Sequence, residues 1–287
     1  MRAAVRGTQI YFDVEGAALV PDGSVMREKP VAFVLHGGPG GDHTGFKPGM
    51  SPLATDMQLI YIDHRGHGRS APADPATYTL DENVEDLEAL RLHLGLGPVV
   101  VIGTIYGGMV AMAYAARYPA AVGKLVLIVT TADGGFRARA KAWVETHGTP
   151  DQQRVCALLW AGRLETPEQM AEFYAVMGPL YSRRYNPESA ALSRGRATYT
   201  PKAINNAFKP DGFLARMDLR PELARITAPT LILAGRHDWI CPPDYSEEIH
   251  RLIPGSQLEI FEHSSHSIRA DEPEALNRSL SRFIAPQ

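Results

Sequence analysis

Apolar residues fall into short continuous runs along most of the chain, at 31–35, 58–62, 99–102, 124–129, 230–233 and 257–261. The runs are rich in β-branched residues and end in glycine or charged residues. Strands that are buried on both faces of a parallel sheet show continuous apolar runs instead of alternating ones. We therefore expect each run to be a strand of a mostly parallel sheet.

Helical patterns separate these runs. Thr79 stands three residues before Glu82, which is the spacing of a capping box, and apolar residues then recur on one face up to Leu94. Residues 109–117, 243–252 and 273–283 predict three more helices. Alternating strands and helices predict an α/β fold, with a mostly parallel central sheet flanked by helices.

The alternation stops between about residues 132 and 225, where the pattern is helical. Its large apolar side chains are Phe136, Trp143, Trp160, Met170, Phe173, Tyr174, Met177, Tyr181, Tyr185, Tyr199, Phe208 and Phe213. An ordinary helical core would give the same pattern, but this segment lies between two predicted strands. We interpret it as a helical cap over the sheet edge where α/β folds bind ligands. The predicted division is core at 1–131, cap at 132–225 and core again at 226–287.

The composition is that of a globular protein. The 287 residues are 45% hydrophobic and 21% charged, with a net charge of -3, which gives no electrostatic reason to expect nucleic acid or an anionic membrane as a partner. No apolar stretch has the length of a signal peptide or a membrane span, so we expect a cytoplasmic protein, either monomer or homodimer. Cys156 and Cys241 are expected to be buried free thiols instead of a disulfide.

The segment GTIYGG at 103–108 has the spacing of a nucleophile elbow, G-x-S-x-G, with Ile105 at the central position. Such a turn forces its central residue into a backbone conformation with positive φ. A β-branched residue is among the worst choices there, which favours the replacement of a serine. Thr104 is a poor substitute nucleophile because its side chain leaves the turn in another direction.

Two later loops supply an acid and a base. Asp238 follows the run at 230–233, and His266 lies in HSSH at 263–266, with His263 as its competitor. Asp238 could orient the imidazole and stabilise its charged form. A solvated aspartate or a structural histidine is the plainer reading of each residue alone. The order of nucleophile position, acid and base along the chain favours a catalytic triad.

Two further loops follow the first two runs. HGGPGG at 36–41 could bring backbone N–H groups close to the oxyanion of an acyl-transfer reaction, and no nucleotide-binding frame fits it. DHRGHGRS at 63–70 is expected to brace this region. A metal site made of His36, His64 and His67 is disfavoured, because no cysteine or paired carboxylate stands at ligand spacing.

On these motifs, together with GRHD at 235–238, the chain resembles the α/β-hydrolase superfamily and, within it, the prolyl-iminopeptidase-like branch. The resemblance implies a serine at position 105, Asp238 as acid, His266 as base and no cofactor or metal. It also implies oxyanion donors at Gly38 and Tyr106, with Gly37 beside the substrate.

The chain departs from that branch at Ile105, at Tyr106, where aminopeptidase members carry Trp, and at His64, where they often carry Gln. Those members bind a free amino terminus with cap carboxylates. The candidates for that role here are Glu145, Glu165, Glu168, Glu172 and Glu188.

With serine at position 105, we expect a hydrolase that cleaves carboxylic esters or lactones through an acyl-enzyme. Its partner would be a small-molecule acyl substrate, and macrolactones are one class that an aromatic cap of this size could hold. The alternatives are a proline-iminopeptidase-type aminopeptidase and a non-catalytic ligand-binding protein. An epoxide hydrolase or dehalogenase would need a carboxylate at position 105. As Ile105 stands there, we expect this chain to be nearly inactive.

Overall fold

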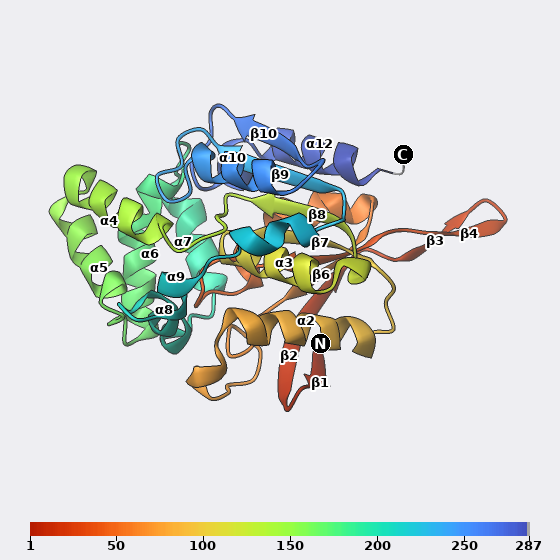
Figure 1. Ribbon diagram of the computed structural model, residues 1–287, viewed down its shortest axis with the longest axis horizontal. Coiled ribbons are helices and arrows are strands. Elements are labelled where there is room, and N and C mark those ends of the chain that lie inside the picture. The colour runs from red at the N-terminus through yellow and green to blue at the C-terminus, as the bar shows by residue number, and fades with distance from the viewer. Residues whose placement is uncertain (286–287) are drawn as a thin grey trace.

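A twisted sheet of eight strands runs through the middle of the computed structural model, which describes residues 1–285 (Figure 1). The strand order is β1-β2-β6-β5-β7-β8-β9-β10, and all neighbours from β6 to β10 are parallel. The parallel strands are β5 (Val31–Leu35), β6 (Gln58–Ile62), β7 (Val99–Thr104), β8 (Val122–Ile128), β9 (Thr230–Gly235) and β10 (Gln257–Phe261). All six predicted strands and the mostly parallel sheet are confirmed.

Helices cover both faces of this sheet, which is why its strands are continuously apolar. The helices α2 (Leu80–His93), α3 (Tyr106–Arg117) and α10 (Pro243–Leu252) pack on one face. The other face is covered by α1 (Lys47–Met50), the following 3-10 turn, α11 (Ile268–Asp271) and α12 (Pro273–Ile284). Within one strand, Phe33 joins the first core and Val34 the second, so neither face is left to solvent.

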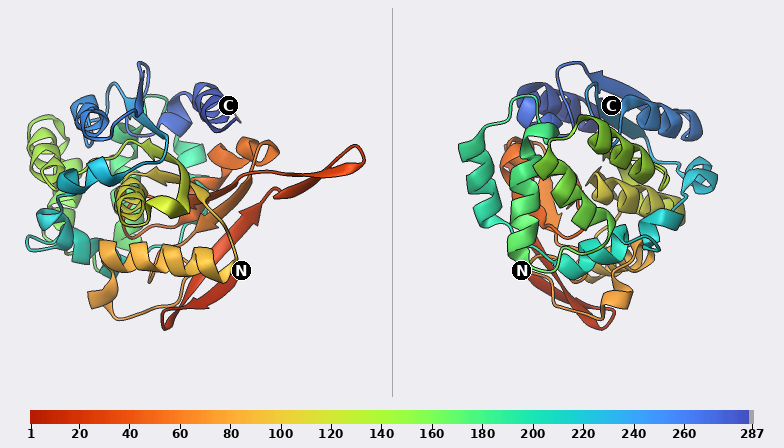
Figure 2. Two further views of the ribbon diagram at one scale, coloured as in Figure 1. Left: turned by 45° about the vertical axis from the view of Figure 1, so that its right-hand side comes forward. Right: turned by 90° about the vertical axis from the view of Figure 1, so that its left-hand side faces the viewer.

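The first four strands were not predicted from the sequence. The strands β1 (Arg2–Val5) and β2 (Thr8–Glu15) are antiparallel to each other, and β2 is antiparallel to β6. Their burial alternates along the chain, so they lack the continuous apolar run that marks the other strands. The strands β3 (Leu19–Asp22) and β4 (Val25–Glu28) form a separate hairpin that projects from the body (Figures 1 and 2).

The segment between β8 and β9 is helical, as predicted. It contains α4 (Phe136–His147), α5 (Pro150–Trp160), α6 (Pro167–Tyr181), α7 (Pro187–Arg196), α8 (Pro201–Phe208) and α9 (Phe213–Arg216). These helices gather at one end of the sheet, and the right-hand view of Figure 2 shows them spread across that end. Thr149 and Thr166 start α5 and α6 with capping boxes.

Two simpler expectations can also be compared with the fold. Cys156 and Cys241 are both buried free thiols, as predicted. Within residues 1–285, none of the helices combines the length and the apolar character needed to cross a membrane.

Candidate active site

The segment 103–108 turns sharply from the end of β7 into α3. Ile105, at the turn, has φ 56 and ψ -116, so the predicted positive φ is confirmed. A Cβ atom on Gly103 would overlap the carbonyl oxygen of Gly107, and one on Gly107 would overlap the carbonyl oxygen of Leu35. The strand and the helix therefore approach so closely that side chains are excluded at both glycines, as the elbow spacing requires.

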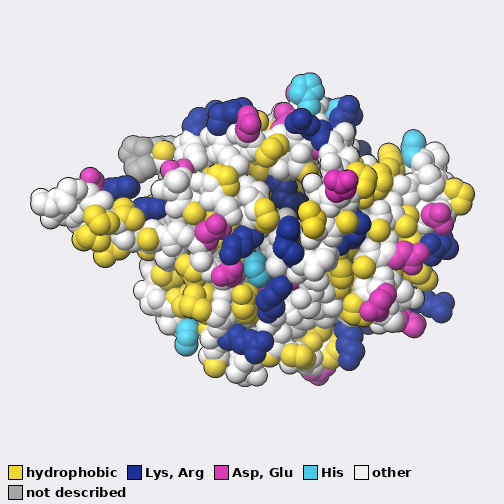
Figure 3. Space-filling view, turned by 180° about the vertical axis from the view of Figure 1, so that it is seen from behind, with side chains coloured by type: hydrophobic (Ala, Val, Ile, Leu, Met, Phe, Trp, Pro, Cys, Tyr) yellow, Lys and Arg dark blue, Asp and Glu magenta, His cyan; other side chains and the backbone are white. Residues whose placement is uncertain are grey.

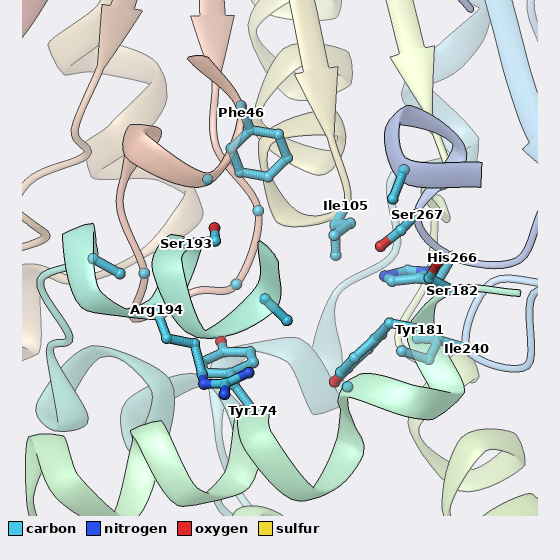
Figure 4. Close-up of a pocket in the computed structure, with 18 of the residues that line it drawn as sticks. Phe46, Ile105, Tyr174, Tyr181, Ser182, Ser193, Arg194, Ile240, His266 and Ser267 are labelled. Atoms are coloured by element: carbon cyan, nitrogen blue, oxygen red, sulfur yellow. The ribbon is translucent and has the colours of Figure 1, made fainter. Parts of the chain in front are cut away.

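The side chain of Ile105 reaches into a cavity and packs against the glycine-rich loop. Its Cδ1 atom is only 2.8 Å from the position that a Cβ atom on Gly37 would occupy. Figure 4 shows Ile105 extending into the cavity that His266 also lines. Apolar carbon therefore fills the space beside Gly37, and position 105 offers no nucleophilic atom.

Asp238 and His266 form a buried pair across two loops. The Nδ1 atom of His266 lies 2.7 Å from Oδ2 of Asp238, and the side chains are 3% and 0% exposed. The other carboxylate oxygen of Asp238 accepts hydrogen bonds from the N–H groups of Ile240 (2.8 Å) and Cys241 (3.0 Å). These contacts fix the carboxylate, and the imidazole keeps its second nitrogen, Nε2, for another partner.

His263, the competing base, is exposed, and it is absent from the lining of the cavity. Of the two candidate histidines, the structure therefore pairs only His266 with Asp238.

One set of possible metal ligands occurs among the described residues. Asp238, Cys241 and His266 each have a ligand atom within 4.8 Å of the others. Because Asp238 and His266 already share a short hydrogen bond, the set is better read as an acid–base pair beside a buried thiol. Burial raises the pKa of Cys241 well above its ordinary value, so the thiol stays protonated at neutral pH.

Two backbone amides near Ile105 have no hydrogen-bond partner among the described residues. Tyr106 is the first residue of α3, so its N–H has no partner within the helix, and Gly38 lies in the loop that follows β5. Neither amide donates a hydrogen bond to another residue in the described part of the chain. Gly37 and Gly38 both line the cavity, which is the place that the resemblance implies for them.

Buried histidines lie behind the glycine-rich loop. The rings of His36 and His64 are 4.5 Å apart, and Nε2 of His36 accepts the backbone N–H of His64. Burial lowers the pKa of all three histidines in this cluster, that of His67 to about 3. The cluster is therefore neutral at physiological pH.

The charged turn at 63–70 ties this region together through its side chains. Both carboxylate oxygens of Asp63 accept backbone N–H groups, one from His43 and one from Arg69. Arg65 makes two hydrogen bonds to Asp86 of α2, at 2.6 and 2.7 Å. These bonds agree with the predicted bracing role of the turn.

The cavity has a volume of about 600 Å³ and lies between the carboxyl ends of the strands and the helices α4 to α8. Its aromatic lining from the helical segment consists of Phe136, Trp160, Phe173, Tyr174, Tyr181, Tyr185, Tyr199 and Phe208. Phe46 and Trp239 add rings from the core, and the ring of Tyr181 is 5.6 Å from that of His266. The predicted aromatic residues Trp143 and Phe213 do not line it.

The charged residues of the cavity lining are mostly arginines. Those among the described residues are Arg184, Arg194, Arg196 and Arg269. None of the five candidate glutamates of the helical segment belongs to the lining. Asp42 does, but it is held by Arg69 in an ion pair of 2.6 Å. These arginines were not predicted as site residues, because no motif or periodicity in the sequence distinguishes them from surface arginines.

A parallel sheet with an elbow, a buried acid–histidine pair and two free amides defines the architecture of an α/β hydrolase. A family model described as alpha/beta hydrolase fold matches residues 30–273, and the chain belongs to that family.

Within the family, the chain is similar to proline iminopeptidases. It is 30% identical to one from Saccharolobus solfataricus, over an alignment that covers 87% of this chain and 83% of the relative. It is 27% identical to Proline iminopeptidase PfmaB from Pestalotiopsis fici, with 96% of this chain and 98% of the relative covered. Among solved structures, an esterase from Exiguobacterium antarcticum has a TM-score of 0.77 at 26% identity and covers 98% of this chain and 97% of its own.

Proposed function

We propose that this chain is a serine-type hydrolase of carboxylic esters or lactones in which Ile105 occupies the nucleophile position. In this proposal, residues 132–225 form a cap over core segments 1–131 and 226–287. The chain as it stands binds small acyl compounds and does not turn them over. The observation that supports this proposal most is the cavity lining, which is aromatic and basic and has no carboxylate available to a ligand.

With serine at position 105, each remaining group has a defined role. The serine oxygen attacks the substrate carbonyl while Nε2 of His266 takes its proton, since Nδ1 is engaged with Asp238. The N–H groups of Gly38 and Tyr106 stabilise the negative charge on the carbonyl oxygen. The alcohol leaves with the proton held by His266, and water then cleaves the acyl-enzyme by the same route.

The charges of the cavity favour an ester or lactone over a peptide with a free amino terminus. Binding a cationic amine requires a carboxylate or a similar acceptor, because an unpaired buried charge is costly. Among the described residues, Asp42 is the acidic side chain of the lining. It is already bound by Arg69, and four arginines would repel the amine.

The side chain at position 105 accounts for the expected inactivity. Removing the nucleophile of a triad lowers kcat by a factor on the order of 10⁶. Ile105 also fills the space beside Gly37, so water has little room to attack a carbonyl bound there. Binding is the activity that remains.

Two other functions have specific support. The names of the relatives favour a proline-iminopeptidase-type aminopeptidase. The apolar residue at position 105 favours a ligand-binding protein of the hydrolase fold that has no reaction to catalyse.

The test is to assay Ile105→Ser with p-nitrophenyl esters, lactones and proline p-nitroanilide, beside Ile105→Ala. The alanine variant removes the same bulk but supplies no nucleophile. We expect only the serine variant to hydrolyse esters or lactones with a burst of acylation, and to act on the anilide far more slowly. A folded serine variant that is inactive on all three classes contradicts the hydrolase proposal, and the fastest turnover on the anilide would establish the aminopeptidase.

A further inference from the structure

Arg269 is an arginine whose charge has no partner within residues 1–285. It lies on α11, three residues after His266, and lines the cavity. Its guanidinium carbon is 4.4 Å from the centre of the Phe46 ring, and its Nε–H donates to the backbone oxygen of Gly45 at 3.1 Å. The rest of the guanidinium, with its other N–H donors, is left for a ligand.

The surroundings of Arg269 disfavour its unpaired charge. Burial lowers its pKa to about 10, which still leaves it protonated at neutral pH. Many arginines elsewhere in the chain have carboxylate partners, among them Arg6, Arg65, Arg69, Arg117, Arg139, Arg154, Arg220 and Arg236. A partly desolvated cation without a counter-charge is unfavourable, so an anion in the cavity would relieve a cost that is already present.

A second unpaired arginine lines the cavity from the helical segment, and Figure 4 shows it beside Tyr174, away from Phe46. Arg194, on α7, lines the cavity and forms no ion pair with any described residue (Figure 4). The hydroxyl of its neighbour Ser193 is 3.9 Å from the position that a Cβ atom on Gly45 would occupy. Gly45 thus contacts α7 on one side and accepts the hydrogen bond of Arg269 on the other.

We propose that Arg269 forms an anion-binding subsite in the cavity, to which Arg194 adds positive charge from across it, so that the preferred substrates are esters or lactones that carry a carboxylate remote from the scissile carbonyl. This rests on the proposed function, because it names the substrate class of the same cavity. Guanidinium groups bind carboxylates through short charge-assisted hydrogen bonds, often two at once. Since Arg269 lies only three residues from His266, a carboxylate held there would fix the distance of the ester from the imidazole.

The surface is compatible with an anionic ligand. The chain has a net charge of -3, yet Lys and Arg side chains gather over the middle of the face shown in Figure 3. A local group of positive charges attracts anions regardless of the net charge of the whole chain.

The experiment uses the chain as it stands, because Ile105 prevents hydrolysis during a titration. Calorimetry would compare three probes of similar length: monobenzyl adipate, which is anionic, benzyl methyl adipate, which is neutral, and benzyl 6-aminohexanoate, which is cationic. We expect the anionic probe to bind about tenfold more tightly than the neutral one, and the cationic probe to bind most weakly.

Arg269→Gln should remove most of this tenfold preference and leave the neutral probe within about twofold of its original affinity. Arg194→Gln should remove a smaller part, and Arg269→Lys should retain part of it, because lysine keeps the charge but loses the planar fork. The matched control is Arg183→Gln, which removes the same charge from an exposed residue outside the cavity lining. It should leave all three affinities unchanged.

Equal affinity for the anionic and neutral probes overturns the subsite, as does a preference that survives the double variant Arg269→Gln/Arg194→Gln. Different results would contradict the proposed function and the subsite, so the two can be distinguished. If Ile105→Ser hydrolyses nothing while the charge preference is intact, the subsite stands and the hydrolase does not. If Ile105→Ser cleaves anionic and neutral esters with the same KM, the hydrolase stands and the subsite does not.

Discussion

The two halves of the candidate site are held in place by different kinds of interaction. In the acid–base half, hydrogen bonds hold a charged carboxylate in place. Asp238 accepts two backbone N–H groups, and its Oδ2 lies 2.7 Å from Nδ1 of His266. The nucleophile half has uncharged groups at its centre, and the charged pairs of the turn at 63–70 lie farther from position 105. Its glycine-rich loop rests on uncharged histidines, its elbow depends on close backbone contact, and Ile105 ends in methyl groups.

The difference shows that the frame of the site and its chemistry depend on different residues. The turn at position 105 is imposed by the close packing of α3 on β7 at Gly103 and on the end of β5 at Gly107. It persists with a β-branched residue whose backbone conformation costs on the order of 1–3 kcal/mol. A frame that tolerates this strain should accept serine without rearrangement.

Of the changes that test this comparison, replacing the acid Asp238 should have the largest effect. In the Ile105→Ser background, Asp238→Asn should lower kcat by about 10⁴-fold, the size seen when a triad carboxylate is replaced by its amide. The amide can still occupy the place of the carboxylate, but it favours the wrong tautomer of His266 and cannot stabilise its charged form.

The measurement is steady-state ester hydrolysis with KM and kcat separated. Asp211→Asn, at an exposed aspartate, is the matched control and should have no effect. A loss of less than tenfold for Asp238→Asn would mean that the two halves do not work together.

The sheet was predictable wherever burial on both faces produced a continuous apolar run. Helices covered both sides of the parallel strands β5 to β10, so these strands were visible in the sequence. In β1 and β2, Ala3 and Val5, then Ile10 and Phe12, are buried and alternate with more exposed residues. Such short alternating strands depend on their antiparallel neighbours, and a search for continuous runs misses them.

The site could be predicted only where a motif constrains the backbone. The spacing of glycines around Ile105 predicted its positive φ, and the loop positions of Asp238 and His266 predicted that the two would meet. The cavity arginines had no such signal. Arg194 and Arg269 line the same cavity from segments about 75 positions apart, and their positions there depend on how α7 packs beside the sheet.

The elbow frame itself can be broken without changing any polar group. Gly107→Ala should destabilise the protein by about 3 kcal/mol, because its Cβ atom would overlap the backbone oxygen of Leu35, which cannot move within the sheet. Gly97→Ala is the matched control, since nothing lies within 4 Å of its Cβ position. Urea unfolding at neutral pH measures both. Equal midpoints would mean that the strand and helix are not in close contact at the elbow.

The smallest expected effect tests the neutral support of the nucleophile half. Burial lowers the pKa of His64 well below its usual 6.5 in the folded state, so below pH 6.5 the unfolded chain binds the proton that the folded chain refuses. The stability that this histidine contributes is fully present above pH 6.5, and it decreases as the pH falls toward the folded-state pKa. The slope is at most about 1.4 kcal/mol per pH unit for each such histidine.

His64→Gln, which keeps a polar side chain without a titrating group, should therefore flatten the dependence of the unfolding free energy on pH between pH 6.5 and 5. This window lies above the pKa of Asp63, which hydrogen bonding by His43 holds below its ordinary value. The exposed His93→Gln is the matched control and should leave the slope unchanged. If His64→Gln keeps the original slope, His64 takes up its proton at the same pH in the folded protein as in the unfolded chain. The nucleophile half would then be supported by charge, as the acid–base half is, and the contrast between the two halves would disappear.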